Sequence, residues 1–193
     1  RAFASRAEVT SSIRRRTARG PTATTYTAGV SDIGGDQTRW LDDDEQRSWR
    51  ALVMGMTLLL DRLDVDLRRQ CDLSLVEYEI LVRLSEAEDR RMRMAHLADA
   101  LAHSRSRVTH TVARMEHAGL VVRMSSPDDG RGVVATMTDK GFDLLERMAP
   151  LHVEGVRTHL VDLVSREDFQ AVGRVMNAVC DHLVEGHPAM EIR

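Results

Sequence analysis

A short run near the middle of the chain, S-R-S-R-V-T-H over residues 104–110, concentrates side chains that could bind a nucleic acid. In a helix, Val108 of this run faces the side opposite to its arginine and hydroxyl groups. Arginine can donate two hydrogen bonds to guanine, and Ser or Thr can bind phosphates or bases, so the polar side suits a major groove. The positive end of the helix also favours a phosphate near Ser104. The DNA-binding residues predicted on this helix are Ser104, Arg105, Ser106, Arg107, Thr109, His110 and Arg114. The alternative for its arginines is an ordinary solvated helix face.

A predicted β-hairpin follows and carries a second group of candidates. Two β-prone runs, 121–125 and 133–137, flank S-P-D-D-G-R-G at 126–132, whose Pro and Asp-Gly favour a turn. An arginine at the tip, Arg131, could enter a narrow minor groove, where the negative potential is enhanced. Asp129 could orient that guanidinium through a charge-assisted hydrogen bond, or it could serve only the turn.

The helix after the hairpin begins with two more candidates. Lys140 and the Thr138 hydroxyl lie in or beside its first turn, where they could contact backbone phosphates. Thr138 could equally be only an N-cap. We count Lys140 among the predicted DNA-binding residues.

The elements that must position these residues begin upstream. Ser74 and Glu77 form a capping-box pattern that opens a helix ending near residues 86–91, and a short amphipathic stretch follows over 94–101. The next helix, capped by Ser104, is expected to end at Gly119. Helix, tight turn, helix and β-hairpin is the order of a winged helix-turn-helix. Its predicted core comprises Leu81, Leu84, Leu97, Leu101, Val108, Val112, Met115, Leu120 and Val134.

Long amphipathic helices are predicted on both sides of this lobe. Apolar residues recur at steps of three and four over 44–70, 138–163 and 166–184, with Ser165 and Asp168 capping the last helix. These apolar faces exceed what the central lobe can cover, which predicts a homodimer formed through the terminal helices. A monomeric bundle that uses the faces internally is the alternative.

The fold class is therefore mainly α with a small β-hairpin wing: a winged helix-turn-helix domain plus terminal dimerisation helices. The predicted organisation is a disordered tail over 1–37, an N-terminal dimerisation helix over 38–72, the DNA-binding lobe over 73–137, C-terminal dimerisation helices over 138–187 and a tail over 188–193. The alternative for the Arg-rich start of the chain is a transit peptide.

Composition and charge restrict the function class. The 193 residues are 42% hydrophobic and 30% charged, and no apolar run approaches the roughly 20 residues that span a bilayer, which argues against a membrane protein. Two distant cysteines give no disulfide framework, so a cytoplasmic, nucleoid-associated location is expected. The net charge of −3 conceals a basic segment at 90–141, which holds eight Arg and Lys140 against five acidic residues.

Three stretches of the sequence together resemble one known family. L-S-L-V-E-Y-E-I-L-V-R-L, M-A-H-L-A-D-A-L-A-H-S-R-S-R-V-T-H-T-V-A-R-M-E-H-A-G-L-V-V-R and D-D-G-R-G-V-V-A-T-M-T-D-K-G are similar to the MarR family of bacterial transcriptional regulators, over about residues 40 to 185. The family's wing D-x-R pair falls on Asp129 and Arg131, and its T-x-x-G on Thr138 and Gly141. The opening of the first helix further resembles an actinobacterial branch. The resemblance implies a homodimer that binds a pseudo-palindromic operator in double-stranded DNA, usually as a repressor, and often releases it when a small phenolic or anionic effector binds.

Effector residues follow from the resemblance by placement alone. The family's cleft lies among the first, second and fifth helices, and the candidates here are Trp49, Arg50, Val53, Met54, Tyr78 and His96. An arginine beside an aromatic ring could hold a carboxylate or a phenol. Core packing or surface exposure is the alternative for each of them.

Metal, redox and catalytic readings find little support in the sequence. His103, His110 and His117 recur every seven residues, but seven helical residues advance by about 10.5 Å, too far for two ligands of one zinc ion. A metal shared across a dimer and redox sensing by Cys71 or Cys180 remain minor alternatives. No catalytic or phosphate-binding motif is present, so no cofactor, no metal and no enzymatic activity are expected. A protein-interaction module that lost DNA binding is the remaining alternative.

Overall fold

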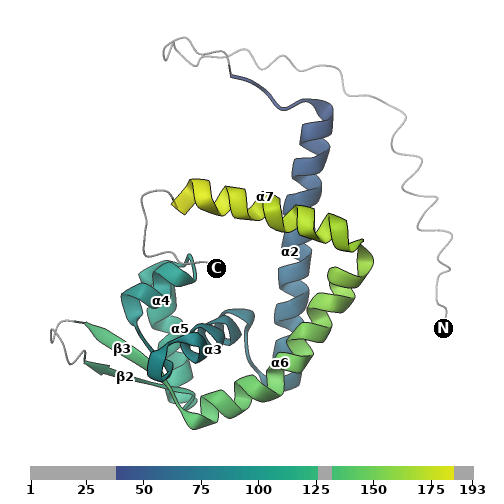
Figure 1. The fold of residues 1–193 in the computed structure, drawn as a ribbon. Helices are drawn as coiled ribbons and strands as arrows, with labels where there is room; N and C mark the ends of the chain where they lie inside the picture. Colours follow the sequence, from purple (N-terminus) through teal and green to yellow (C-terminus); the bar gives the residue numbers. More distant parts are fainter. Residues whose placement is uncertain (1–37, 126–131, 185–193) are drawn as a thin grey trace, which may run out of the picture. The chain divides into compact units, whose positions relative to one another are not determined.

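The computed structural model describes residues 38–125 and 132–184. Within these ranges the order of elements is α2 (Asp43–Cys71), α3 (Leu75–Glu86), η1 (Glu88–Arg90), β1 (Arg91–Arg93), α4 (Met94–Ala100), α5 (Arg105–His117), β2 (Val121–Ser125), β3 (Val133–Met137), α6 (Asp139–His159), η2 (Val161–Leu163) and α7 (Arg166–Val184) (Figure 1). They belong to one unit that begins at Asp42. Mainly helical structure with a small sheet confirms the predicted fold class.

Side-chain caps fix the helix starts where the sequence predicted them. At α3, the Ser74 hydroxyl accepts from the Glu77 N–H, while a Glu77 carboxylate oxygen accepts from the Ser74 N–H at 2.9 Å. Asp42 and Glu45 form a second capping box at α2. These reciprocal bonds satisfy backbone donors that a helix N-terminus leaves unpaired.

The sheet has one strand more than the predicted hairpin. Its order is β1-β3-β2 with antiparallel pairing, and β1 pairs with β3 through Met92 opposite Ala135. The sequence R-M-R of β1 contains no β-branched residue, so its strand conformation depends on pairing with β3 rather than on local propensity.

The predicted core of the lobe is largely confirmed. Leu81, Leu84, Leu97, Val108, Val112 and Met115 are almost fully buried, and Leu120 is 7% exposed. Leu101 is only partly buried, and Val134 was wrongly placed in the core. Neighbouring strand residues face opposite sides of a sheet, and here Ala135 and Met137 take the inner side, so Val134 lies on the outer side.

The C-terminal helices differ from the prediction at one point. The helix expected over 138–163 ends at His159, and Val161–Leu163 form a separate 3₁₀ turn. Arg157 Nη2 lies 2.5 Å from Asp162 Oδ1 across this break, an ion pair that stabilises the turn. The following helix, α7, begins where Ser165 and Asp168 predicted it.

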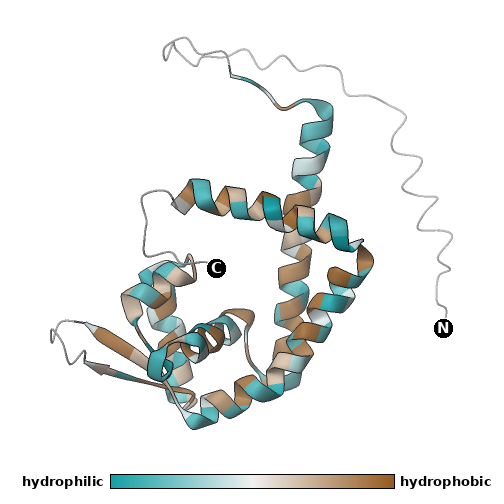
Figure 2. Cartoon of the chain, viewed as in Figure 1, coloured by the Kyte–Doolittle hydropathy of each residue, from teal (hydrophilic) through white to brown (hydrophobic). Residues whose placement is uncertain are grey.

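Apolar side chains remain exposed on two of the terminal helices. Figure 2 shows hydrophobic and hydrophilic residues alternating along α7. Its exposed apolar residues are Phe169, Val172, Val175, Val179 and Leu183, and those of α2 include Trp49, Val53, Met54, Leu58 and Leu60. No helix in the described part of the chain is long and apolar enough to cross a membrane.

Candidate nucleic-acid interface

Helix α5 presents one buried and one exposed side. Val108, Thr111, Val112 and Met115 are buried, and the Thr111 hydroxyl donates to the Arg107 carbonyl at 3.0 Å. The Ser104 hydroxyl caps the helix by accepting from the Arg107 N–H at 3.3 Å. The predicted DNA-binding residues on this helix that lie on its exposed side are Ser104, Arg105, Ser106, Arg107, Thr109, His110 and Arg114.

Besides the capping residue Ser104, two of these exposed residues have a side-chain hydrogen bond or ion pair. The Thr109 hydroxyl donates to the Arg105 carbonyl at 2.8 Å, so its oxygen is left to accept. Arg114 Nη2 lies 3.3 Å from Glu77 Oε1, while 66% of its side chain stays exposed. Both side chains thus have a fixed direction on a surface that is open to a ligand.

A brace that the sequence did not reveal joins α5 to the first strand of the hairpin. Glu116 Oε2 accepts from Arg123 Nε at 2.9 Å and Nη2 at 2.6 Å, and Glu116 Oε1 accepts from the Arg123 N–H at 2.9 Å. These hydrogen bonds lower the pKa of Glu116. Seven residues separate the two partners across a turn, so no helical or strand periodicity could have indicated the contact.

The end of α5 is closed by its own turn and by α6. Gly119 has a φ of 72°, and the Leu120 N–H donates to the Met115 carbonyl at 2.9 Å, as expected after the predicted helix stop. Lys140 Nζ donates to the Ala118 carbonyl at 2.7 Å. The lysine predicted to contact DNA therefore has a protein partner at the C-terminus of α5.

The other predicted wing residues, Asp129 and Arg131, lie outside the described residues. Strands β2 and β3 on either side of them are confirmed at the predicted bounds, 121–125 and 133–137.

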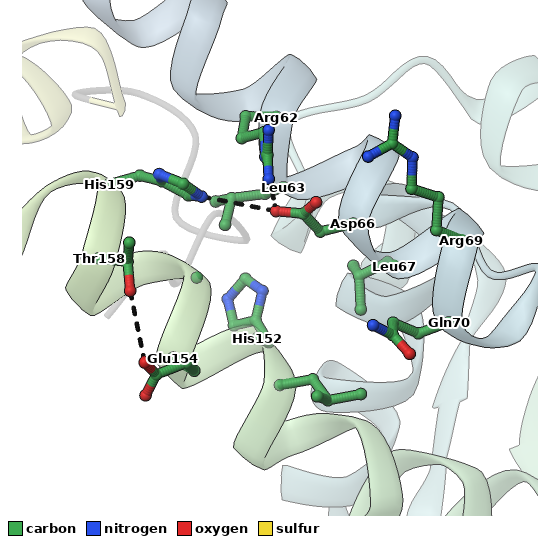
Figure 3. A pocket seen from close by; sticks show the side chains of 12 residues that line it. Arg62, Leu63, Asp66, Leu67, Arg69, Gln70, His152, Glu154, Thr158 and His159 are labelled. Carbon is green, nitrogen blue, oxygen red and sulfur yellow. Dashed lines mark hydrogen bonds and ion pairs between the residues drawn. The ribbon is translucent and has the colours of Figure 1, made fainter.

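Two cavities adjoin the same histidine, His152 of α6. One, of about 410 Å³, lies between α2 and α6, and Figure 3 shows His152 directed into it and Arg62 and His159 directed toward Asp66. Arg62 Nε is 2.8 Å from Asp66 Oδ2, and that hydrogen bond lowers the pKa of Asp66. The other cavity, of about 470 Å³, is bordered by α3 and by the residues around Ala100.

An aromatic pair forms the wall of the second cavity. The rings of Tyr78 and His152 have centroids 4.5 Å apart, and Arg83 lines the same cavity. Burial raises the pKa of Tyr78 and lowers that of His152, and His152 Nδ1 is buried with no hydrogen-bond partner in the described part of the chain. The cavity thus combines aromatic rings with the Arg83 guanidinium, which pairs with Glu86, and with the carboxylate of Glu79.

The structure does not bring the six effector candidates together. Tyr78 lines the second cavity, but none of the other five lines either cavity. Those five are exposed on α2 and α4, namely Trp49, Arg50, Val53, Met54 and His96. Arg50 Nη2 donates to Gln46 Oε1 at 3.1 Å.

Comparison with known proteins gives one consistent result. A sequence family described as the MarR family matches residues 72–132. The HTH-type transcriptional regulator PecS of Dickeya dadantii (strain 3937) is 30% identical over 138 residues, which cover 69% of this chain and 82% of PecS.

Two solved structures from Streptomyces coelicolor are also similar. Sco3205, a MarR family transcriptional regulator in complex with DNA, is 41% identical with a TM-score of 0.72, covering 75% of this chain and 94% of that chain. AbsC, another MarR family transcriptional regulator, is 42% identical with a TM-score of 0.71, covering 76% of this chain and 98% of that chain.

Proposed function

The chain belongs to the MarR family of transcriptional regulators, and from this premise we propose that it binds a specific DNA sequence by placing α5 in the major groove. The observation that carries the proposal is the division of α5, in which four residues are buried and the polar residues predicted to bind DNA are exposed. Arg105 and Arg107 are both exposed, so their guanidinium groups can reach bases or phosphates, although Arg107 also interacts electrostatically with Glu79 of α3. The reported complex of the similar Sco3205 with DNA supports the same function.

We propose that the functional unit is a homodimer formed through α7 and α2. Val172, Val175 and Val179 lie on one side of α7 at helical spacing and are 43%, 55% and 44% exposed. Trp49 and Leu58 of α2 are exposed to a similar extent. A second copy that covers these side chains would remove a large apolar area from water, which favours association.

A two-fold dimer has a geometric consequence for the DNA site. Its two α5 helices would enter successive major grooves about 34 Å apart on one side of the duplex. The operator is accordingly expected to be pseudo-palindromic, and bound protein would block transcription as a repressor.

The cavity beside Tyr78 supports a response to a small anionic or phenolic effector. Tyr78 and His152 supply aromatic surface for a phenol. Arg83 pairs with Glu86 at 3.4 Å, and Glu79 also lines the cavity, so an anionic group would have to take the place of Glu86 beside the guanidinium. An effector would release DNA only if it bound the DNA-incompetent arrangement more tightly than the competent one. The exposed candidates Trp49, Arg50, Val53, Met54 and His96 remain proposals for a site that the partner copy would complete.

The test is selection of random duplexes with the purified chain, followed by titration of the selected duplex at several salt concentrations. Sequence-specific binding predicts a half-site repeated with two-fold symmetry and a steep loss of affinity with salt, because bound phosphates release counterions. A protein-interaction module on the same fold would select no sequence and show no such slope.

A further inference from the structure

The first turn of α6 closes over the C-terminus of α5. Lys140 Nζ donates to the Ala118 carbonyl at 2.7 Å, and the Thr138 hydroxyl lies 2.8 Å from the Gly119 carbonyl. The Thr138 N–H donates to the Leu120 carbonyl at 3.0 Å. A helix leaves its last carbonyl groups without intrahelical donors, and a cation near them is stabilised by the helix dipole. Lys140 of α6 thus satisfies the carbonyl of Ala118, the C-cap of the helix proposed to contact DNA, and the N-cap Thr138 bonds to the turn that follows it.

Gly141 brings the backbone of α6 into direct contact with Leu120, in the turn that follows α5. A Cβ atom on this residue would lie 2.3 Å from the Leu120 carbonyl oxygen and 3.0 Å from Met137 Cγ. Only glycine fits this separation without a shift, so the start of α6 cannot move relative to the end of α5 unless these contacts break.

The Lys140 side chain is exposed, and its chemistry fits a hydrogen bond to the protein's own backbone. It is the single lysine among 27 basic residues. A flexible stem that ends in a compact ammonium can reach a lone carbonyl, whereas the planar guanidinium of arginine suits paired acceptors. A phosphate would have to bind the ammonium together with the Ala118 carbonyl, or displace that carbonyl from it.

We propose that Lys140 is a positioning residue that fixes the angle of α5 against α6. In this role it raises the affinity for the operator relative to other DNA without contacting a phosphate. This inference rests on the proposed function. Because α6 also packs along α2, the same contact would tie the orientation of α5 to the helices of the proposed dimer. An error in that orientation would affect base contacts, which need a defined geometry, more than contacts with the uniform phosphate backbone.

The experiment compares Lys140→Met with wild type on two duplexes, the selected operator and a shuffled duplex of equal length and composition. Arg147→Met is the matched control, because it removes the same charge from the exposed side of α6 about two turns away. Affinity is measured at several salt concentrations, and thermal unfolding gives the folded fraction of each variant.

The proposal predicts that Lys140→Met loses up to about tenfold in operator affinity, because the change in affinity is limited by the free energy that this hydrogen bond to a charged group contributes to the orientation of α5. Affinity for the shuffled duplex should change by less than about twofold, and the slope of log affinity against log salt should stay unchanged. Lys140→Arg should keep part of the operator preference that Lys140→Met loses, since one guanidinium N–H can also donate to a carbonyl, although the planar group fits a lone acceptor less well. Gly141→Ala, where it folds, should lose the same preference.

Three results would overturn the proposal. If Lys140→Met lost the same affinity for both duplexes, and its slope of log affinity against log salt fell by about one ion, Lys140 would be a phosphate contact. If the affinity for both duplexes fell only in proportion to the folded fraction, Lys140 would contribute to stability alone. If the affinity of Lys140→Met equalled that of the wild type, Lys140 would have no role in DNA recognition. Failure of the wild type to prefer any duplex would instead refute the proposed function, and the inference with it.

Discussion

Glu77 of α3 and Arg114 of α5 form an ion pair, with 3.3 Å between Oε1 and Nη2. The other oxygen of the same carboxylate accepts from the Ser74 N–H at 2.9 Å and from the Ser74 hydroxyl at 2.6 Å. Only 13% of the Glu77 side chain is exposed, so its position is well fixed. The cap that begins α3 therefore also sets the direction of an arginine proposed to contact DNA.

Replacement of Glu77 should lower stability. Glu77→Ala removes the reciprocal cap and the ion pair and should cost about 1–2 kcal/mol of unfolding free energy, while Glu77→Gln should cost less because its amide oxygen can still accept from Ser74. Urea unfolding measures the free energy of unfolding of both variants. Glu86→Ala, which removes only an exposed ion pair with Arg83 at the end of the same helix, is the control, and equal stability of Glu77→Ala and the control would contradict the role of the Glu77 contacts.

A second prediction concerns the wing. If Arg131 enters a minor groove, Arg131→Ala should weaken operator binding by about 1–3 kcal/mol and reduce the salt slope by about one ion. Arg157→Ala removes an arginine that pairs with Asp162 and should leave the titration unchanged. An operator titration of Arg131→Ala that overlays that of the wild type would exclude the wing contact.

The brace between Glu116 and Arg123 should make stability depend on pH. The hydrogen bonds from Arg123 hold the pKa of Glu116 below its ordinary value of 4.5, so the stabilisation is present above that pH and is lost as the pH falls through the lower, folded-state pKa. The difference in stability between wild type and Glu116→Gln, followed by chemical unfolding, should therefore shrink below about pH 4.5. A difference that stays constant from neutral pH into this acidic range would rule out the brace as its source.

The proposed dimer can be tested on α7. Val172 is 43% exposed in the single chain, so Val172→Asp should not disturb the fold of a monomer but should bury a charge in the proposed interface and dissociate the dimer. Sedimentation measures the mass of each variant in solution and so distinguishes a monomer from a dimer. Asn177→Asp, which introduces a charge at another exposed position of α7, is the control, and unchanged association of both variants would place the interface elsewhere.

Local chemistry accounts for the parts of the fold that the sequence predicted. The pairs Ser74–Glu77 and Ser165–Asp168, and the helix stop at Gly119, act over a few residues, so their spacing alone is informative. The exposed residues of α5 followed from helical periodicity in the same way.

Contacts between distant residues account for what was missed. Strand β1 exists because it pairs with β3, more than 40 residues away. The protein partner of Lys140 could not be predicted, because the Ala118 carbonyl 22 residues earlier is a backbone atom that no sequence pattern identifies. Val134 was placed in the core, and the buried Ala135 was not named, because V-V-A-T-M alternates too weakly to show which side of the strand is buried.

The most direct test is the mass and affinity of the purified protein on the duplex that it selects, measured by sedimentation and titration at about 50 mM salt and again at about 200 mM. We predict one dimer per two-fold site and an affinity that falls steeply between these conditions. A stable monomer, or a protein that binds no duplex more tightly than any other at the lower salt concentration, would contradict DNA recognition through paired α5 helices.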